Sequence, residues 1–208
     1  KLKLLPQKVS LNEFSKRMIT LFSERANDKN LQLYLTLDEN IPEYVKVDEH
    51  RLSQIISNLI SNAIKFTEKG DIHLYVNVLN RKNNIATLEF KVQDTGIGIP
   101  KEKQELIFNK YNQIANSANY LLTQSGTGLG LSIAKQLTEL MEGEIGLFSK
   151  EKEGSVFWVK IETPIVKEKG SYSSDLNKKS SNQYNLNVLL VDDREINLKV
   201  AGLMLQKL

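Results

Sequence analysis

Three polar side chains that could bind a metal ion and a polyphosphate recur at helical spacing: Asn58, Asn62 and Lys65. Residues three and four apart lie on the same face of a helix, so all three would point in one direction. Two amide oxygens and an ammonium group suit a hard cation and phosphate oxygens. Asn forms helices poorly, and a solvated face usually carries Glu and Lys instead. Taken alone, however, the pattern leaves an ordinary solvated helix face open.

A carboxylate followed by two glycines forms a second candidate group, Asp94-Thr-Gly96-Ile-Gly98. A carboxylate at the end of a strand can accept a hydrogen bond from an exocyclic amine, such as that of adenine. The glycines would let a planar ring approach the backbone closely. The alternative is a glycine turn with a surface aspartate.

A second glycine cluster, Gly126-Thr127-Gly128-Leu129-Gly130, precedes a helical pattern. The free N–H groups and the positive end of the helix dipole would favour phosphate there. The competing interpretation is a dinucleotide-binding turn, which requires a strand just before the first glycine. Residues 112–125 show no strand pattern, which disfavours that alternative.

A helix over Asp48–Thr67 is needed to position the first group. At ~100° per residue its apolar residues form one broad face; they are Leu52, Ile55, Ile56, Leu59, Ile60 and Ala63. Asp48 can cap the helix by accepting hydrogen bonds from the first turn. The opposite face would carry Asn58, Asn62 and Lys65.

Periodicity and turn residues predict the remaining elements. They are helices over 10–28, from Pro100 to about 109 and from 126 to about 141, and strands over 31–37, 44–47, 72–79, 85–93, 144–149 and 155–162. A loop at 81–84 would join the third and fourth of these strands. Residues 112–125 fit a loop and residues 165–186 have linker composition. A strand over 187–193 and a helix would end the chain.

Composition excludes several classes of protein. The chain has 208 residues, 40% hydrophobic and 25% charged, with a net charge of +3. These values are typical of a globular protein and too mildly basic to predict nucleic-acid binding. No stretch is apolar for long enough to span a membrane, so we expect no membrane contact by this fragment. Cysteine is absent, which excludes disulfides and thiolate chemistry and fits the cytosol.

The order of the motifs resembles the catalytic ATP-binding domain of sensor histidine kinases, within the gyrase and histidine kinase ATPase superfamily. The resemblance covers about residues 10–164 and includes NLISNAIKFT, DTGIGIP, IFNKY, GTGLGLSI and GSVFWVKI. It implies a two-layer α/β sandwich, with a mixed sheet and helices on one face. It also implies ATP and Mg²⁺ as cofactors.

The resemblance implies roles for single residues. Asn62 would be the Mg²⁺ ligand with Asn58 beside it, Lys65 would contact phosphate oxygens, and Asp94 would bind the adenine amine. Gly96 and Gly98 would line the base pocket, Gly126, Thr127, Gly128, Leu129 and Gly130 would meet the phosphates under a lid, and Phe108 would anchor the start of that lid.

The side chain at position 58 favours phosphoryl transfer over hydrolysis of ATP. Gyrase-like relatives carry Glu there as a general base that activates water, and Asn58 cannot take a proton. The domain should therefore hold ATP for transfer, which needs mainly positioning and charge neutralisation. In the family the acceptor is an imidazole on a separate dimerisation helix. The histidines of this chain, His50 and His73, lack that context, so we expect ATP binding without self-phosphorylation.

Two features qualify this expectation. Relatives often place Arg or Lys in the lid to hold the γ-phosphate, and residues 112–125 contain neither. Lys110 is a possible substitute, and Tyr111 stands where Phe is common. A non-catalytic module that binds a nucleotide or a partner remains an alternative, as does a gyrase-type ATPase.

The ends of the chain suggest a larger protein. Residues 1–9 resemble the connector that leaves the dimerisation helices. Residues 187–208 resemble the first strand and helix of a response-regulator receiver domain, in which Asp192 and Asp193 would bind Mg²⁺. We therefore expect a cytoplasmic part of a hybrid sensor histidine kinase in two-component signalling. Its partners would be the dimerisation helices and the receiver, and we expect a homodimer of the full-length protein. Membrane anchoring of the parent protein is left open, although many family members are anchored.

Overall fold

The computed structural model describes residues 3–108 and 129–166, which belong to one unit, Lys1–Glu168. Its strands are β1 (Gln7–Ser10), β2 (Gln32–Leu37), β3 (Tyr44–Val47), β4 (Asp71–Lys82), β5 (Ile85–Asp94), β6 (Glu144–Lys150) and β7 (Gly154–Pro164). Its helices are α1 (Leu11–Asn27), α2 (Glu49–Phe66), α3 (Lys101–Gln104) and α4 (Gly130–Leu140).

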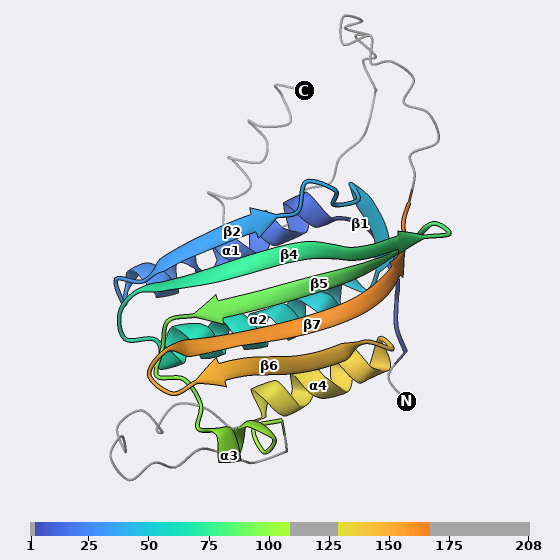
Figure 1. The fold of residues 1–208 in the computed structure, drawn as a ribbon. Coiled ribbons are helices and arrows are strands. Elements are labelled where there is room, and N and C mark those ends of the chain that lie inside the picture. The colour runs from blue at the N-terminus through green and yellow to red at the C-terminus, as the bar shows by residue number, and fades with distance from the viewer. Residues whose placement is uncertain (1–2, 109–128, 167–208) are drawn as a thin grey trace, which may run out of the picture. The chain divides into compact units, whose positions relative to one another are not determined.

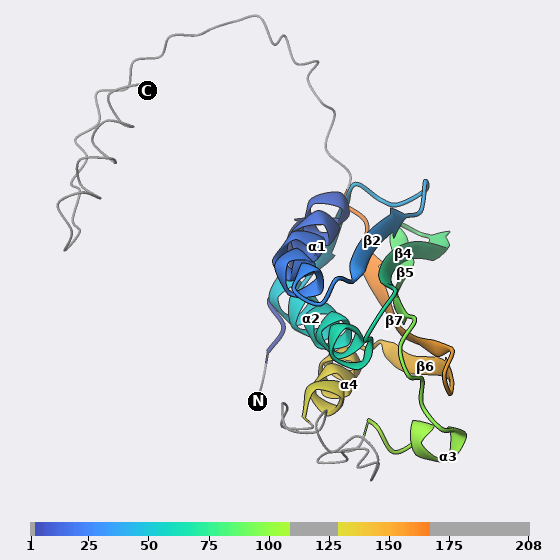
Figure 2. The ribbon, with the colours of Figure 1, turned by 90° about the vertical axis from the view of Figure 1, so that its left-hand side faces the viewer.

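The strands form a five-stranded sheet in the order β2-β4-β5-β7-β6 (Figure 1). β2 runs parallel to β4, and the other neighbours are antiparallel. Apolar residues alternate along the strands, so one face of the sheet is buried. α1, α2 and α4 all lie on that face (Figure 2). The predicted two-layer α/β sandwich with a mixed sheet is confirmed.

The long helix α2 forms as its sequence predicts. The Asp48 carboxylate accepts a hydrogen bond from the Arg51 backbone N–H at 3.1 Å and caps the first turn. The apolar face is fully covered: Leu52, Ile55, Ile56, Leu59 and Ile60 are all 0% exposed. Burial of this face supplies most of the helix's stability, since packing of an apolar face stabilises a helix in a protein more than its intrinsic propensity does.

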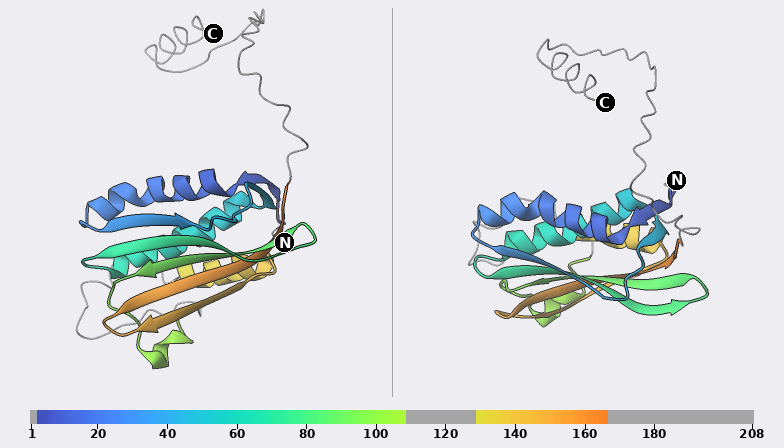
Figure 3. Two further views of the ribbon diagram at one scale, coloured as in Figure 1. Left: turned by 45° about the horizontal axis from the view of Figure 1, so that its top comes forward. Right: turned by 90° about the horizontal axis from the view of Figure 1, so that it is seen from above.

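The structure differs from the predicted elements in four places. Residues 7–10 form a strand that pairs with β3 in a separate two-stranded sheet, although four residues without clear alternation gave no local signal. β4 continues to Lys82, because Asn83 and Asn84 adopt positive φ values of 52° and 64° and make a tight two-residue turn (Figure 3). α3 ends at Gln104 rather than near residue 109, and α4 begins at Gly130, with Leu129 outside the helix, rather than at residue 126.

Candidate functional site

α2 presents the first candidate group away from the sheet. Asn58, Asn62 and Lys65 are half-buried, whereas the residues of the opposite face are fully buried. The Lys65 ammonium lies 5.1 Å from the centre of the Phe66 ring. The structure therefore places the three predicted side chains on one helix face, and their roles stay predictions.

Asn58 faces the start of α4. Its Oδ1 atom is 3.5 Å from the point that a Cβ atom on Gly130 would occupy. Its Nδ2 atom is buried and has no hydrogen-bond partner among the described residues. A buried N–H group without a partner costs free energy. This group is thus available to a ligand or an ordered water.

Asp94, at the end of β5, is only 5% exposed. Its carboxylate accepts a hydrogen bond from the Gly96 backbone N–H at 2.9 Å, and the backbone of Ser155 also hydrogen-bonds to it. Burial raises the pKa of Asp94, and these two hydrogen bonds offset the increase only in part. A buried acceptor of this kind suits a neutral donor such as an exocyclic amine.

The first glycine cluster packs against the C-terminal end of α2. A Cβ atom on Gly96 would lie 2.5 Å from the Phe66 carbonyl oxygen, and Ile97 N donates to that same oxygen at 3.3 Å. Gly98 has a φ of +67°, and a Cβ there would collide with the Lys150 carbonyl oxygen. Both glycines are therefore required by close backbone contacts.

The structure describes only some of the remaining predicted site residues. Phe108 is partly buried, and its ring meets Phe157 edge to face at 6.4 Å between centroids. Leu129 and Gly130 are half-buried at the start of α4. Gly126, Thr127, Gly128, Asp192 and Asp193 lie outside the described residues, as do Lys110 and Tyr111.

Three further residues near the site were not predicted from the sequence. Lys29 donates from its Nζ atom to the carbonyl oxygens of Ile64 (2.7 Å) and Lys65 (3.1 Å), the last turn of α2. Thr67 is fully buried, and its hydroxyl has no hydrogen-bond partner among the described residues. Ser155 lies opposite Asp94 in the β5–β7 register. The contacts of Lys29 and Ser155 join positions far apart in sequence, which local periodicity cannot reveal.

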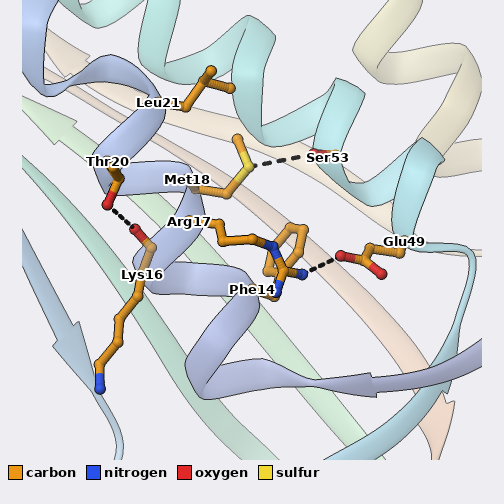
Figure 4. A pocket seen from close by; sticks show the side chains of 8 residues that line it. All are labelled: Phe14, Lys16, Arg17, Met18, Thr20, Leu21, Glu49 and Ser53. Carbon is orange, nitrogen blue, oxygen red and sulfur yellow. Dashed lines mark hydrogen bonds and ion pairs between the residues drawn. The ribbon is translucent and has the colours of Figure 1, made fainter. Parts of the chain in front are cut away.

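A separate hollow of about 530 Å³ lies between α1 and α2 (Figure 4). Its lining residues are Phe14, Lys16, Arg17, Met18, Thr20, Leu21, Glu49 and Ser53. Arg17 pairs with Glu49 across it, and Ser53 Oγ donates to Met18 Sδ at 3.3 Å. None of the predicted nucleotide-binding residues lines this hollow.

Comparisons with known proteins show which family the chain is similar to. The family described as histidine kinase-, DNA gyrase B- and HSP90-like ATPase matches residues 47–165. The chain is 35% identical to the sensor histidine kinase AruS of Pseudomonas aeruginosa over 198 residues, which cover 95% of this chain and 19% of AruS. It is 36% identical to the aerobic respiration control sensor protein ArcB of Escherichia coli over 208 residues, which cover 100% of this chain and 26% of ArcB.

A solved structure supports the same similarity. Full-length ShkA, crystallised in complex with AMPPNP, superposes with a TM-score of 0.69 at 27% identity. The match covers 79% of this chain and 32% of ShkA. The chain thus spans between about a fifth and a third of the length of these proteins.

Proposed function

Because the chain belongs to the family of histidine kinase-, DNA gyrase B- and HSP90-like ATPases, we propose that it binds Mg-ATP and holds the γ-phosphoryl group for transfer to a histidine on a separate dimerisation domain. One observation carries the proposal. α2 meets Gly130 at Asn58 and meets Gly96 at Phe66, so a single helix contacts both glycine clusters. A nucleotide held along its polar face would reach both.

In this proposal each end of the nucleotide has its own contacts. Asp94 accepts the hydrogen bond from the adenine amine, beside Gly96 and Gly98. Lys65 and the N-terminus of α4 neutralise phosphate charge. Asn62 supplies an amide oxygen to Mg²⁺, whose other ligands are phosphate oxygens and water. No three His, Cys, Asp or Glu side chains gather in residues 3–108 and 129–166, so an all-carboxylate cage in that part of the chain does not compete with this arrangement.

Transfer is favoured over hydrolysis by the side chain at position 58. A carboxamide cannot take a proton from water, so Asn58 does not serve as a general base. Its buried Nδ2 atom instead suits a hydrogen bond to an acceptor on the nucleotide or on a bound water. AruS, one of the relatives named above, is a sensor histidine kinase, which accords with phosphoryl transfer.

The domain would work within a hybrid sensor histidine kinase. Residues 1–9 would lead from dimerisation helices, residues 165–186 would be a linker, and residues 187–208 would open a receiver domain in which Asp192 and Asp193 bind Mg²⁺. The phosphoryl group would pass from the histidine to a receiver aspartate, and the full-length protein would be a homodimer. In the described part of the chain, no helix is both long enough and apolar enough to cross a membrane.

Titration with ATP and with a non-hydrolysable analogue, with and without Mg²⁺, tests the binding step. We expect saturable binding that strengthens with Mg²⁺; absence of binding would refute the proposal. A dimerisation domain that carries its histidine is then added with γ-labelled ATP. Transfer of the label supports the kinase. No transfer at saturating Mg-ATP would instead support a non-catalytic nucleotide-binding module, and steady phosphate release by the chain alone would support a gyrase-type ATPase.

A further inference from the structure

The segment that follows the first glycine cluster is tied to the turn between β6 and β7. Lys152 N donates to the Ile97 carbonyl oxygen at 2.7 Å, and Ile99 N donates to Ser149 Oγ at 2.8 Å. Ser149 Oγ lies 3.0 Å from the Gly154 carbonyl oxygen and 2.9 Å from Ser155 Oγ. Ser155 is the residue opposite Asp94. The backbone around Asp94 is therefore held from two sides.

Gln104, in α3, hydrogen-bonds to both of these segments. Its Nε2 atom donates to the Ile99 carbonyl oxygen at 2.8 Å and to the Ser149 carbonyl oxygen at 2.9 Å. A carboxamide nitrogen has two hydrogens, so one side chain can satisfy both acceptors. α3 has four residues and no side-chain N-cap bond, and so short a helix is unstable alone. These bonds join the glycine segment, β6 and α3 at one point.

We infer that Gln104 is a positioning residue for nucleotide binding, which fixes the first glycine cluster in the shape that receives the base. This inference rests on the proposed function. Gln104 acts through Ile99 and Ser149, not by touching the ligand. When only a fraction of the molecules has the binding-competent shape, the apparent affinity equals the intrinsic affinity multiplied by that fraction. Loss of both bonds should therefore weaken binding while the sheet and the other helices stay folded.

The position of this contact predicts which ligands are affected. Asp94, Gly96 and Gly98 would contact the base, which adenosine and ATP share. A change at Gln104 should weaken both ligands by the same factor. A change at Lys65, on the phosphate side, should weaken ATP and leave adenosine unchanged. The comparison of the two ligands therefore distinguishes an effect on the base site from an effect on the phosphate site, and rescue of binding by a donor at position 104 distinguishes positioning from a general loss of structure.

The experiment compares variants of matched size by calorimetry for ATP and chemical-shift titration for adenosine. Gln104→Met keeps the length and removes the donors, Gln104→Glu replaces them with acceptors, and Gln104→Lys restores donation. Gln104→Met should raise both dissociation constants about tenfold. Gln104→Glu should raise them further, because carboxylate oxygens would face two carbonyl oxygens. Gln104→Lys should recover most of the affinity.

Glu102→Gln, on the exposed part of the same short helix, is the matched control and should bind like the wild type. Ser149→Ala removes the hydroxyl that accepts the hydrogen bond from Ile99 N. It should weaken binding as Gln104→Met does, and it can be measured even if the Gln104 variants do not fold. Wild-type affinity in a folded Gln104→Met variant, or weakening of ATP alone, would overturn the inference; if the Gln104 variants do not fold, wild-type affinity in Ser149→Ala would overturn it. Failure of the wild type to bind ATP would overturn the proposed function, and this inference with it.

Discussion

The Asn58 carboxamide oxygen lies 3.5 Å from the position that a Cβ atom of residue 130 would take. That distance is an ordinary van der Waals contact, so a methyl group on residue 130 fits against Asn58. The centre of α2 is thereby fixed against the first residue of α4. This contact joins the polar face of α2 to the second glycine cluster.

The size of the side chain at position 130 should control nucleotide affinity. Gly130→Ala should fold and bind ATP like the wild type, because its Cβ fits. Gly130→Val should displace Asn58 and raise the dissociation constant for Mg-ATP about tenfold or more. Calorimetric titration of the two variants checks this. Equal affinities for Ala and Val would show that the contact with Asn58 does not matter for binding.

Asn62→Ala should remove the effect of Mg²⁺ on ATP affinity. The amide oxygen is the protein ligand assigned to the cation, so the gain in affinity on adding Mg²⁺ should fall by about tenfold or more. Affinity in the presence of a chelator should change little. Ser61→Ala, on the next position of the same helix, is the control. Asn62 loses its assigned role if the variant keeps the wild-type response to Mg²⁺.

Gly98→Ala should destabilise the fold. A φ of +67° is unfavourable for any residue with a Cβ, and here the Cβ would also meet the Lys150 carbonyl oxygen. We expect a loss of about 2 kcal/mol or more in the free energy of unfolding. Urea denaturation measures it, with Gly130→Ala as a glycine-to-alanine control at an uncrowded position. A loss no larger than that of the control would contradict the crowding argument.

Local patterns in the sequence are enough to predict the core of this fold. The apolar face of α2, its cap at Asp48 and the alternation along β4 and β5 all depend on neighbours within a few residues. The polar face of α2 could also be predicted, because spacing alone places Asn58, Asn62 and Lys65 together. The sequence predicted glycines at 96 and 98 for the approach of a planar ring, which stays a prediction, and it gave no sign that the carbonyl oxygens of Phe66 and Lys150 crowd these positions.

Contacts between distant segments could not be predicted in the same way. β1 is held by pairing with β3 and by Leu5 N, which donates to Asp48 Oδ2 at 2.8 Å. Gln104 and Lys29 lie on short or irregular segments and bond to carbonyl groups of remote residues. Such bonds leave no periodic pattern, since a backbone carbonyl accepts a donor whatever its side chain. They become visible only when the chain is folded.

Lys29→Met should loosen the C-terminal turn of α2. The ammonium group satisfies two carbonyl oxygens and sits at the negative end of the helix dipole. Its removal should cost about 1 kcal/mol of stability. It should also weaken ATP binding, because Lys65 lies in the same turn. Thermal unfolding and titration measure the two effects, and Lys16→Met, exposed on α1, should show neither. An unchanged melting temperature would show that Lys29 does not cap the helix.

Asp94→Asn should weaken nucleotide binding, and its stability relative to the wild type should increase as pH rises. Burial raises the pKa of Asp94 above its ordinary value of 3.8, so the folded chain holds this proton more tightly than the unfolded chain. Ionisation therefore removes stability as pH rises from the unfolded pKa through the higher folded pKa. Asn does not titrate. From pH 4 to pH 7, the free energy of unfolding of the wild type should therefore fall relative to that of the variant. The change is ~1.4 kcal/mol for each unit by which the folded pKa exceeds the unfolded pKa.

Asp38 supplies a control of opposite sign. Hydrogen bonds from the backbone N–H groups of Asn40 (2.8 Å) and Val78 (3.2 Å) lower its pKa, so the folded chain holds this proton less tightly. The wild type should then gain stability over Asp38→Asn as pH rises above the folded pKa of Asp38, and lose that advantage as pH falls through it. Urea midpoints across the pH range give both differences. If the two variants shifted in the same direction, burial would not be the cause of the Asp94 effect, and the case for a buried acceptor that receives the adenine amine would be lost.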